Sequence, residues 1–384
     1  MLALALGHVV NDIQGGALPI CLPQLKELFG LSYSQLAAIV LLQNVMSSVI
    51  QPVFGYLTDR YSLVRWLPFC AALSCAGFAF VGWAPSYIMV LCIVVVVSLG
   101  SATFHPQASK TVNFLSGLHN KASNMGIFMV GGNLGLAAGS IMMTFLLSLE
   151  GGLDNTIYFV LPGLLAFACM HKAMPDFKRV NIEHKKQVEA TTTRSSSRIP
   201  YFALFLILFY IFMRSTINAG ISTYIPIFFI KYKGFDQVMA GTLVSAFLIG
   251  GAVGTYTGAL ISDKYGVRKI LIGSVTICIP AIASITWVNS YFLAIIVVFV
   301  SGFCIIGSFA TTTIITQCLL PNNVGMASGL SIGMSVGFGG VGVTILGFIA
   351  DSFTLPFVMQ IMAFLPIICV ITGILVPIPA ILRK

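Results

Sequence analysis

Long apolar segments alternate with short polar ones along the whole chain, and this pattern predicts membrane-spanning helices. A helix needs about 20 predominantly apolar residues to cross the hydrocarbon core of a bilayer. Segments of that length follow one another, so we expect about twelve spans. They cover residues 2–28, 34–57, 66–84, 87–109, 123–147 and 155–174 in the first half, and 201–230, 237–261, 268–288, 291–317, 325–350 and 356–381 in the second.

A short motif between two apolar segments occurs twice, about 204 residues apart, which is the signature of an internal repeat. Gly55–Arg65 contains a small residue, an acid four positions later and then cations, and Ala259–Lys269 repeats this order. The same offset pairs Gly30 with Gly234. The chain is therefore predicted to contain two copies of one unit, duplicated in the same direction.

The duplication also predicts where the chain divides. Residues 175–198 are polar, basic and partly rich in threonine and serine, which is typical of a flexible linker. We expect an all-α membrane protein with one six-helix bundle over residues 1–174. A cytoplasmic linker would cover 175–199, and a second six-helix bundle 200–384.

Helix ends and helix contacts can be anticipated at a few positions. Ser32 and Asp236 precede the second and eighth spans, where an N-cap side chain is favoured. Glycines also recur at close to four-residue spacing, which lets helix backbones approach each other in lipid. They are Gly131, Gly132, Gly135 and Gly139, and Gly325, Gly329, Gly333 and Gly337.

The composition excludes a water-soluble protein, because 58% of the residues are hydrophobic and only 8% are charged. Soluble domains carry about 25% charged residues. The nine cysteines are scattered through apolar segments and indicate reduced core thiols. The sequence begins with apolar residues and has no basic region before them, so we interpret 2–28 as a retained span rather than a signal peptide.

The net charge of +9 is explained by membrane topology. With both termini in the cytoplasm, Lys26, Lys231 and Lys233 lie outside and Arg214 lies within a span, while the other basic residues are cytoplasmic. This distribution obeys the positive-inside rule. We therefore expect a monomer in the cell inner membrane, in contact with lipid and not with nucleic acid.

Ionisable residues within spans are costly and are therefore functional candidates. Asp12 should lie about 15 Å deep in the first span, one helical turn after His8. Because lipid disfavours a charged carboxylate, Asp12 is a candidate for binding and releasing protons, with His8 as a second carrier or as an orienting group. The alternative is a permanent ion pair that pins the first helix to another.

Arg214 is the lone cation in the first predicted helix of the second half. Its guanidinium stays charged and offers a fork for phosphate or carboxylate. We expect it to bind an anionic substrate, and a permanent salt bridge to Asp12 is the alternative. His105 precedes Pro106 on the fourth span, where it could sense protons or could only bond to the backbone at a kink. The other candidates for lining a substrate cavity are polar: Asn11, Asn218, Asn44, Gln43 and Gln317.

The repeated motif itself suggests a gate at the cytoplasmic surface. Asp59 and Asp263 lie at helix ends, where an acid can cap a neighbouring helix or pair with Arg65 or Lys269. Contacts of this kind would hold the two bundles together and break on opening, whereas the alternative is that the cations only fix orientation. The gating candidates are Gly55, Asp59, Arg60, Arg65, Asp263, Lys264 and Arg268.

Two six-helix repeats joined by a basic loop resemble the layout of major facilitator transporters, and the duplicated motif resembles that superfamily's loop motif. Ser62 and Ala259 depart from it, since glycine is usual at both positions. The sequences His8–Asp12, with Pro19 and Pro23, and Gly100–Ser109 resemble the fosmidomycin-resistance branch. Gly126–Ser140 is similar to that branch and to the glycine-rich element of drug/proton antiporters, where proline often replaces Ser140. The resemblance implies proton-driven export of small polar drugs, including phosphonates.

The sequence contains no catalytic motif. A G-x-x-x-x-G-K-S/T phosphate loop is absent, which argues against ATP as the energy source. There is no H-E-x-x-H or paired-cysteine motif, and we expect no cofactor, no metal and no enzymatic activity. We therefore expect a secondary transporter in which protons bind at Asp12, His8 and His105, and an anionic or polar drug binds at Arg214. An uptake symporter for an organic anion or sugar is the nearest alternative, and a receptor or scaffold without transport is another.

Overall fold

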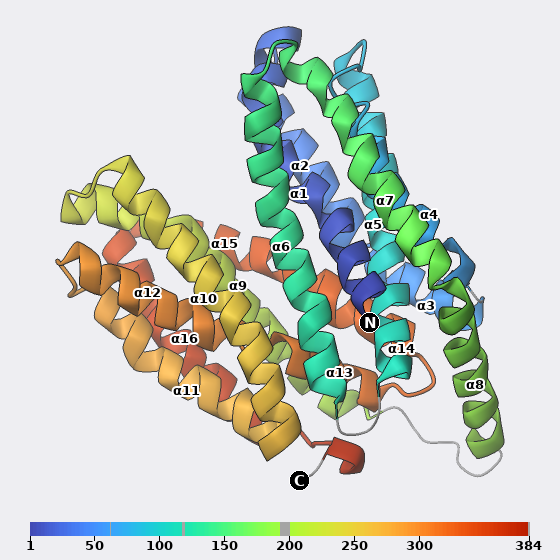
Figure 1. The fold of residues 1–384 in the computed structure, drawn as a ribbon. Helices are drawn as coiled ribbons and strands as arrows, with labels where there is room; N and C mark the ends of the chain where they lie inside the picture. Colours follow the sequence, from blue (N-terminus) through green and yellow to red (C-terminus); the bar gives the residue numbers. More distant parts are fainter. Residues whose placement is uncertain (62, 117–119, 193–199, 383–384) are drawn as a thin grey trace. The chain divides into compact units, whose positions relative to one another are not determined.

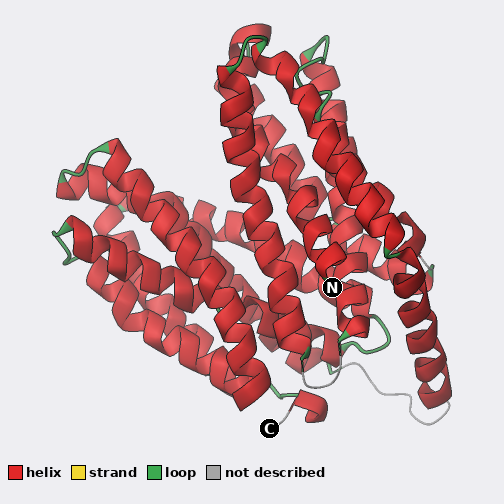
Figure 2. Cartoon of the chain, in the orientation of Figure 1, coloured by secondary structure: helices red, strands yellow, loops and turns green. Residues whose placement is uncertain are grey.

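The computed structural model describes residues 1–61, 63–116, 120–192 and 200–382. Within these ranges the chain is helical and contains no strand (Figure 2). Figure 1 labels the α-helices in chain order. The first half contains α1 (Leu2–Phe29), α2 (Tyr33–Ser48), α3 (Gln51–Arg60), η1 (Leu63–Trp66), α4 (Leu67–Phe78), α5 (Tyr87–Leu115), α6 (Lys121–Ser148), η2 (Gly152–Phe159), α7 (Val160–Lys172) and α8 (Met174–Thr192). The second half contains α9 (Tyr201–Lys233), α10 (Gln237–Tyr265), α11 (Val267–Ile285), α12 (Tyr291–Ile306), α13 (Phe309–Leu319), α14 (Val324–Ser328), a π-helical turn (Gly329–Gly333), α15 (Met334–Ser352), α16 (Leu355–Leu375) and η4 (Ala380–Leu382).

Ten of the described helical segments are long and apolar enough to cross a membrane. Two further helices coincide with predicted spans but are not among the ten: α1, and the shorter apolar segment Leu63–Phe78. Several predicted spans are interrupted in the structure. The second breaks between α2 and α3, just before Pro52, and the tenth breaks between α12 and α13 at Gly307 and Ser308. The count of twelve is therefore not confirmed by length and hydropathy alone.

Two pairs of residues that the repeat relates have the same local structure. Ser32 caps α2, and its hydroxyl accepts a hydrogen bond from the backbone N–H of Gln35. Asp236 caps α10 in the same way and accepts from the N–H of Met239. Just upstream, Gly30 and Gly234 end α1 and α9 in the left-handed region, with φ of 61° and 71°, which glycine adopts without strain. The predicted N-caps are confirmed.

The expectation of a flexible linker from residue 175 is wrong for the part that the structure describes. Residues 174–192 form α8, and only 193–199 lie outside the described residues. The Phe177 side chain is buried, and the Asn181 amide donates to the Phe177 carbonyl and to the Thr111 hydroxyl of α5. The segment is polar, but it also contains good helix formers and one apolar face, so it stays helical against its neighbours.

The chain forms two compact units. Unit 1 contains Met1–Gly117, Ile127–Ser197 and Pro321–Gly333, and unit 2 contains Leu118–Gly126, Arg198–Leu320 and Met334–Lys384. Each unit thus includes a short segment from the other half of the sequence. The predicted domain boundaries at 174 and 200 remain a prediction.

Close helix contacts in each unit depend on glycine. In unit 1, a side chain on Gly131, Gly135 or Gly139 of α6 would overlap carbonyl oxygens of α1. In unit 2, glycines of α10 face carbonyl oxygens of α12 in the same way, as at Gly250 and Gly254. The four-residue spacing on α6 therefore brings its backbone against α1, as predicted, and this contact supports the polar residues that α1 carries.

Candidate functional site

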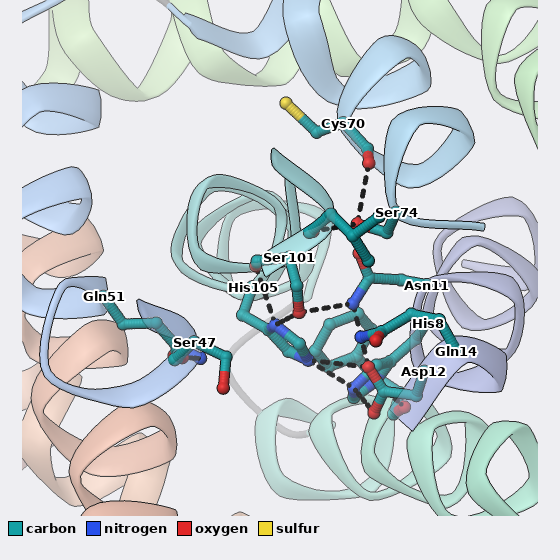
Figure 3. Close-up of polar contacts among 12 residues, drawn as sticks. His8, Asn11, Asp12, Gln14, Ser47, Gln51, Cys70, Ser74, Ser101 and His105 are labelled. Carbon is teal, nitrogen blue, oxygen red and sulfur yellow. Dashed lines mark hydrogen bonds and ion pairs between the residues drawn. The ribbon is translucent and has the colours of Figure 1, made fainter. Parts of the chain in front are cut away.

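Two histidines and an aspartate meet within unit 1, where α1 and α5 face each other (Figure 3). His8 and Asp12 lie one turn apart on α1, with 3.2 Å between His8 Nε2 and Asp12 Oδ2. His105 comes from α5, and its Nε2 lies 3.1 Å from Asp12 Oδ1 and 3.1 Å from His8 Nε2. Both histidines are buried, at 3% and 7% exposure, while the Asp12 side chain retains 17%. We call these three residues the His–Asp cluster.

The backbone fixes the orientation of both imidazoles. His8 Nδ1 lies 2.6 Å from the Phe128 carbonyl oxygen of α6, and His105 Nδ1 lies 2.9 Å from the Ser101 carbonyl oxygen. A carbonyl oxygen only accepts hydrogen bonds, so each Nδ1 must carry a hydrogen and donate it. The Phe128 ring also stacks on the His8 ring, with 4.1 Å between centroids. Each Nε2 therefore points into the cluster.

This arrangement needs a proton or a metal ion between the facing atoms. If both histidines were neutral and Asp12 were ionised, two Nε2 lone pairs and a carboxylate would face one another with no hydrogen between them. Contacts of 3.1–3.2 Å between such acceptors are hydrogen-bond distances only when a proton is shared. The geometry is thus that of a cluster holding at least one proton more than this all-acceptor state.

Neighbouring polar groups hold Asp12 in place. The Asn11 amide donates to Asp12 Oδ1 at 2.8 Å and to the Ser101 hydroxyl at 3.0 Å. Ser101 Oγ lies 3.2 Å from His105 Nδ1, so the network returns to α5. Gly132 of α6 closes the remaining side, because a Cβ there would lie 2.6 Å from His8 Nε2 and 2.8 Å from Asp12 Oδ2. Asn11, predicted to line a substrate cavity, lies against the His–Asp cluster.

Arg214 lies in unit 2 and is almost fully buried, at 4% exposure. Its guanidinium carbon lies 4.6 Å from the centre of the Phe309 ring, and Nη2 donates to the Ser335 hydroxyl at 3.3 Å. Within the described residues of unit 2 it forms no ion pair, and its Nε has no hydrogen-bond partner. Asn218 Oδ1, one turn further along α9, likewise has no partner among the described residues. A buried cation with an unused donor edge is suited to receiving an anion.

The three remaining lining candidates differ in their surroundings. Gln43 is buried and donates to Gln14 Oε1 at 2.7 Å, so α1 and α2 share this pair. Asn44 is exposed on α2, and Gln317 is buried on α13.

The two motif acids cap helices. Asp59 accepts from the backbone N–H groups of Gly325 and Met326, at 2.9 Å each, and pairs with Lys110 Nζ at 2.8 Å. Asp263 accepts from the N–H groups of Ala122 and Ser123, at 3.1 and 2.7 Å. Each acid thus caps a segment from the other half of the sequence that lies in its own unit. Of the alternatives considered from sequence, capping is the one observed.

The cations of the motif make other contacts. Arg60 lies over the Tyr56 ring at 4.9 Å, and Lys264 lies over the Tyr265 ring at 5.0 Å. Arg268 donates to the carbonyls of Ile374 and Val376 at 2.9 Å each. Arg65 is exposed on η1, and no ion pair of the described residues joins it or Lys269 to the capping acids. Gly55 allows α3 to contact α14 closely, because a side chain there would overlap the Gly325 carbonyl.

Comparison with known proteins identifies the family, since the family model of the Major Facilitator Superfamily matches residues 4–331 and 234–383. The chain belongs to this superfamily. It is 30% identical over 372 residues to the fosmidomycin resistance protein of Escherichia coli K12, covering 96% of this chain and 91% of the relative. It is also 30% identical over 379 residues to an uncharacterized major-facilitator-type transporter of Bacillus subtilis 168, covering 98% and 92%.

Solved structures of the superfamily share the fold. The crystal structure of the transporter FucP in the outward conformation has a TM-score of 0.77 at 14% identity and covers 98% of both chains. The proton:xylose symporter XylE has a TM-score of 0.76 at 14% identity and covers 98% of this chain and 95% of its own. The resemblance seen in the sequence, to the superfamily and to its fosmidomycin-resistance branch, is confirmed.

Sequence reasoning missed several parts of this major facilitator protein's site. Ser101 and Phe128 orient the histidines through their backbone carbonyls, and such contacts cannot be predicted from the type of residue. Lys110 is one of the basic residues that the charge distribution places in the cytoplasm, and it pairs with Asp59. Gln14 lies between Asp12 and the mid-helix prolines and could have been noticed as a polar residue within a span.

The His–Asp cluster could also hold a metal ion, because its candidate ligand atoms lie within 4.8 Å of one another. Two imidazoles and a carboxylate are acceptable ligands for divalent transition metals. The sequence predicts protons at Asp12, His8 and His105 and no metal. The close approach of the three ligand atoms depends on the packing of α1 against α5. The same atoms lie 3.1–3.2 Å apart, which are also hydrogen-bond distances.

Proposed function

We propose that this protein is a proton-coupled antiporter that exports small polar or anionic compounds, phosphonates among them, by alternating access. The observation that supports the proposal is the His–Asp cluster, whose facing acceptors lie at distances at which they can share a proton. A transporter that exports a substrate against its gradient needs an energy source, and a cluster that can gain and lose a proton within the membrane provides a coupling site.

The membrane arrangement that goes with this function has twelve spans in two six-helix bundles, with both termini in the cytoplasm. Adding α1 and Leu63–Phe78 to the ten long apolar segments gives this number. The bundles would cover residues 1–174 and 200–384 around the segment 175–199, in a monomer of the inner membrane. The distribution of lysine and arginine supports the orientation.

In the proposed cycle, Asp12 is the proton carrier and the two histidines share its proton. Asn11 remains bonded to Asp12 Oδ1 in either state, because its amide can donate to a carboxylate or to the carbonyl oxygen of a carboxylic acid. His8 and His105 deliver the proton along the Nε2 contacts. An exchange reaction follows if proton binding and substrate binding favour different conformations of the transporter.

The substrate would bind at Arg214. Its partnerless Nε and the unsatisfied Asn218 Oδ1 offer a donor and an acceptor, which suits an acid that also carries a hydroxyl or amide group. Phe309 covers one face of the guanidinium, so an anion would approach along its edge, where Arg forms paired hydrogen bonds. The name of the Escherichia coli relative, a resistance protein for fosmidomycin, supports a phosphonate as substrate and export as direction.

Uptake with protons is the rival function. The structural neighbours include a proton:xylose symporter, but at 14% identity this likeness concerns the fold alone. Growth of cells on a toxic phosphonate separates the two, because an exporter protects the cell and an importer sensitises it.

The coupling is tested in proteoliposomes that contain a pH-sensitive dye and a metal chelator, with fosmidomycin added on one side. We expect proton movement to follow substrate addition in the wild type and to vanish in Asp12→Asn. Asp176→Asn is the control, since that acid is 65% exposed and pairs with Arg179 on α8. Substrate-dependent proton movement that persists in a folded Asp12→Asn protein would refute the proposal.

A further inference from the structure

A groove in unit 2, formed by residues other than the His–Asp cluster and Arg214, lies where α10 ends and α11 begins. Its volume is about 590 Å³. It is formed by the turn between the two helices, the first two turns of α11 and the segment that follows α16 (Figure 1). Its lining residues are Tyr265, Gly266, Val267, Arg268, Lys269, Ile272, Gly273, Ile378 and Leu382.

The mouth of the groove is positively charged. Arg268 and Lys269 line it, and Lys264 and Lys269 lie over the Tyr265 ring at 5.0 and 5.8 Å. No ion pair of the described residues involves these three cations. Arg268 is held by the carbonyls of Ile374 and Val376, which orient its guanidinium without neutralising the charge. A ligand at this mouth should therefore be an anion.

The walls of the groove are apolar. Ile272, Ile378 and Leu382 line its length, and a side chain added at Gly273 would meet nothing within 4 Å. The groove also begins where two candidate membrane spans, Val238–Tyr265 and Val267–Ile285, are joined by one residue. A helix end between two spans lies at the boundary of hydrocarbon and water. The cations are thus at headgroup level, and Ile272 and Gly273 continue along α11 into the hydrocarbon, whereas Ile378 and Leu382 follow the end of α16.

We propose that this groove binds an anionic phospholipid, with its phosphate at Arg268 and Lys269 and an acyl chain along Ile272 and Gly273 of α11. Basic sites between helices at the membrane surface are the kind that recognise anionic headgroups. A free phosphate ion would use the cations but would leave the apolar walls without a partner. The amphiphilic lining therefore favours a lipid.

The purified protein in detergent tests the proposal by native mass spectrometry and thermal unfolding, with phosphatidylglycerol, phosphatidylcholine or inorganic phosphate added. We expect bound phosphatidylglycerol and an upward shift of the unfolding temperature with that lipid only. Lys269→Gln should weaken lipid binding several-fold. Gly273→Phe should abolish it by filling the groove, and the open space at this position lets the variant fold.

Matched controls exist at the other end of unit 2. Lys231 lies over the Tyr232 ring at 5.8 Å, as Lys269 does over Tyr265, and Gly241 has the same open surroundings as Gly273. Lys231→Gln and Gly241→Phe should leave lipid binding unchanged. Equal binding of both lipids, an equal effect of inorganic phosphate, or undiminished binding in Gly273→Phe would overturn the proposal. Transport is not measured, so the result is independent of the proposed function.

Discussion

His8 and His105 are 97 residues apart in the sequence, and their Nε2 atoms face each other at 3.1 Å. Each ring is fixed by a backbone carbonyl at its other nitrogen, so neither can turn its Nδ1–H into the cluster without losing that bond. A proton placed between the two rings and Asp12 therefore removes the repulsion between the two Nε2 lone pairs and the carboxylate. Turning a ring would not do so without breaking its bond to a backbone carbonyl. This pairing is the structural reason for assigning proton coupling to the His–Asp cluster.

Two substitutions of His105 distinguish its hydrogen bond to Asp12 from its ability to release a proton. An asparagine can still donate to the Ser101 carbonyl but cannot reach Asp12, whereas a glutamine can donate to Asp12 but cannot release a proton. We expect His105→Asn to lower proton-driven transport at least about tenfold, since it loses a hydrogen bond to a charged group that contributes about 1.5–3 kcal/mol. His105→Gln should also lower transport, because it keeps that bond but cannot pass on a proton. Dye-loaded proteoliposomes measure the rate. Wild-type rates in His105→Gln would show that this histidine only orients Asp12.

Gly132 allows a test that leaves every polar group in place. Gly132→Ala puts a methyl group at 2.6 Å from His8 Nε2, so the His–Asp cluster must open. We expect substrate-driven proton movement to fall strongly while the protein remains folded in detergent. Gly340→Ala is the control, because it also adds a methyl group to a helix but meets nothing within 4 Å. Equal activity of the two variants would contradict a role for the close packing of α6.

The sequence allowed the fold to be predicted more completely than the site. Periodic apolar segments and repeated caps such as Ser32 and Asp236 predict helices, because lipid allows few other backbone structures. His8 and Asp12 could be placed on one helix face from their spacing alone. The contact with His105 depends on how α1, α5 and α6 pack, and the tautomers depend on the Phe128 and Ser101 carbonyls. These contacts depend on the tertiary structure, and they cannot be inferred from the residue pattern of a single sequence.

The segment after residue 174 is a case in which the secondary structure itself was not predicted from the sequence. Its polarity favours a linker, although Phe177 and Asn181 have the four-residue spacing of a helix face. Contact with Thr111 of α5 decides the outcome, because side-chain bonds to a neighbouring helix offset the entropy cost of ordering the segment.

The capping acids should contribute to stability. Asp59 accepts two backbone N–H groups and the Lys110 ammonium, so we expect Asp59→Ala to lower the free energy of unfolding by about 1–3 kcal/mol. Asp263→Ala should act similarly, through Ala122 and Ser123. Asp236→Ala provides the comparison, because its exposed cap accepts one N–H group and should cost only about 1 kcal/mol. Thermal unfolding in detergent measures all three, and an equal loss at each site would argue against a special role for the motif.

Arg214 offers the sharpest test of the substrate assignment. Arg214→Lys keeps a charge over Phe309 but loses the planar guanidinium, so we expect substrate affinity to fall about tenfold. In Arg214→Gln the affinity should fall further, because the charge is also lost. Direct binding of fosmidomycin to purified protein measures both, in a buffer without competing phosphate. Arg179→Gln is the control, since this arginine is 66% exposed and pairs only with Asp176 among the ion pairs of the described residues. If the guanidinium served only the packing of unit 2, Arg214→Lys would change the unfolding temperature and leave the affinity of the folded protein unaltered. A loss of affinity without a loss of stability is therefore the result that assigns the substrate to this residue.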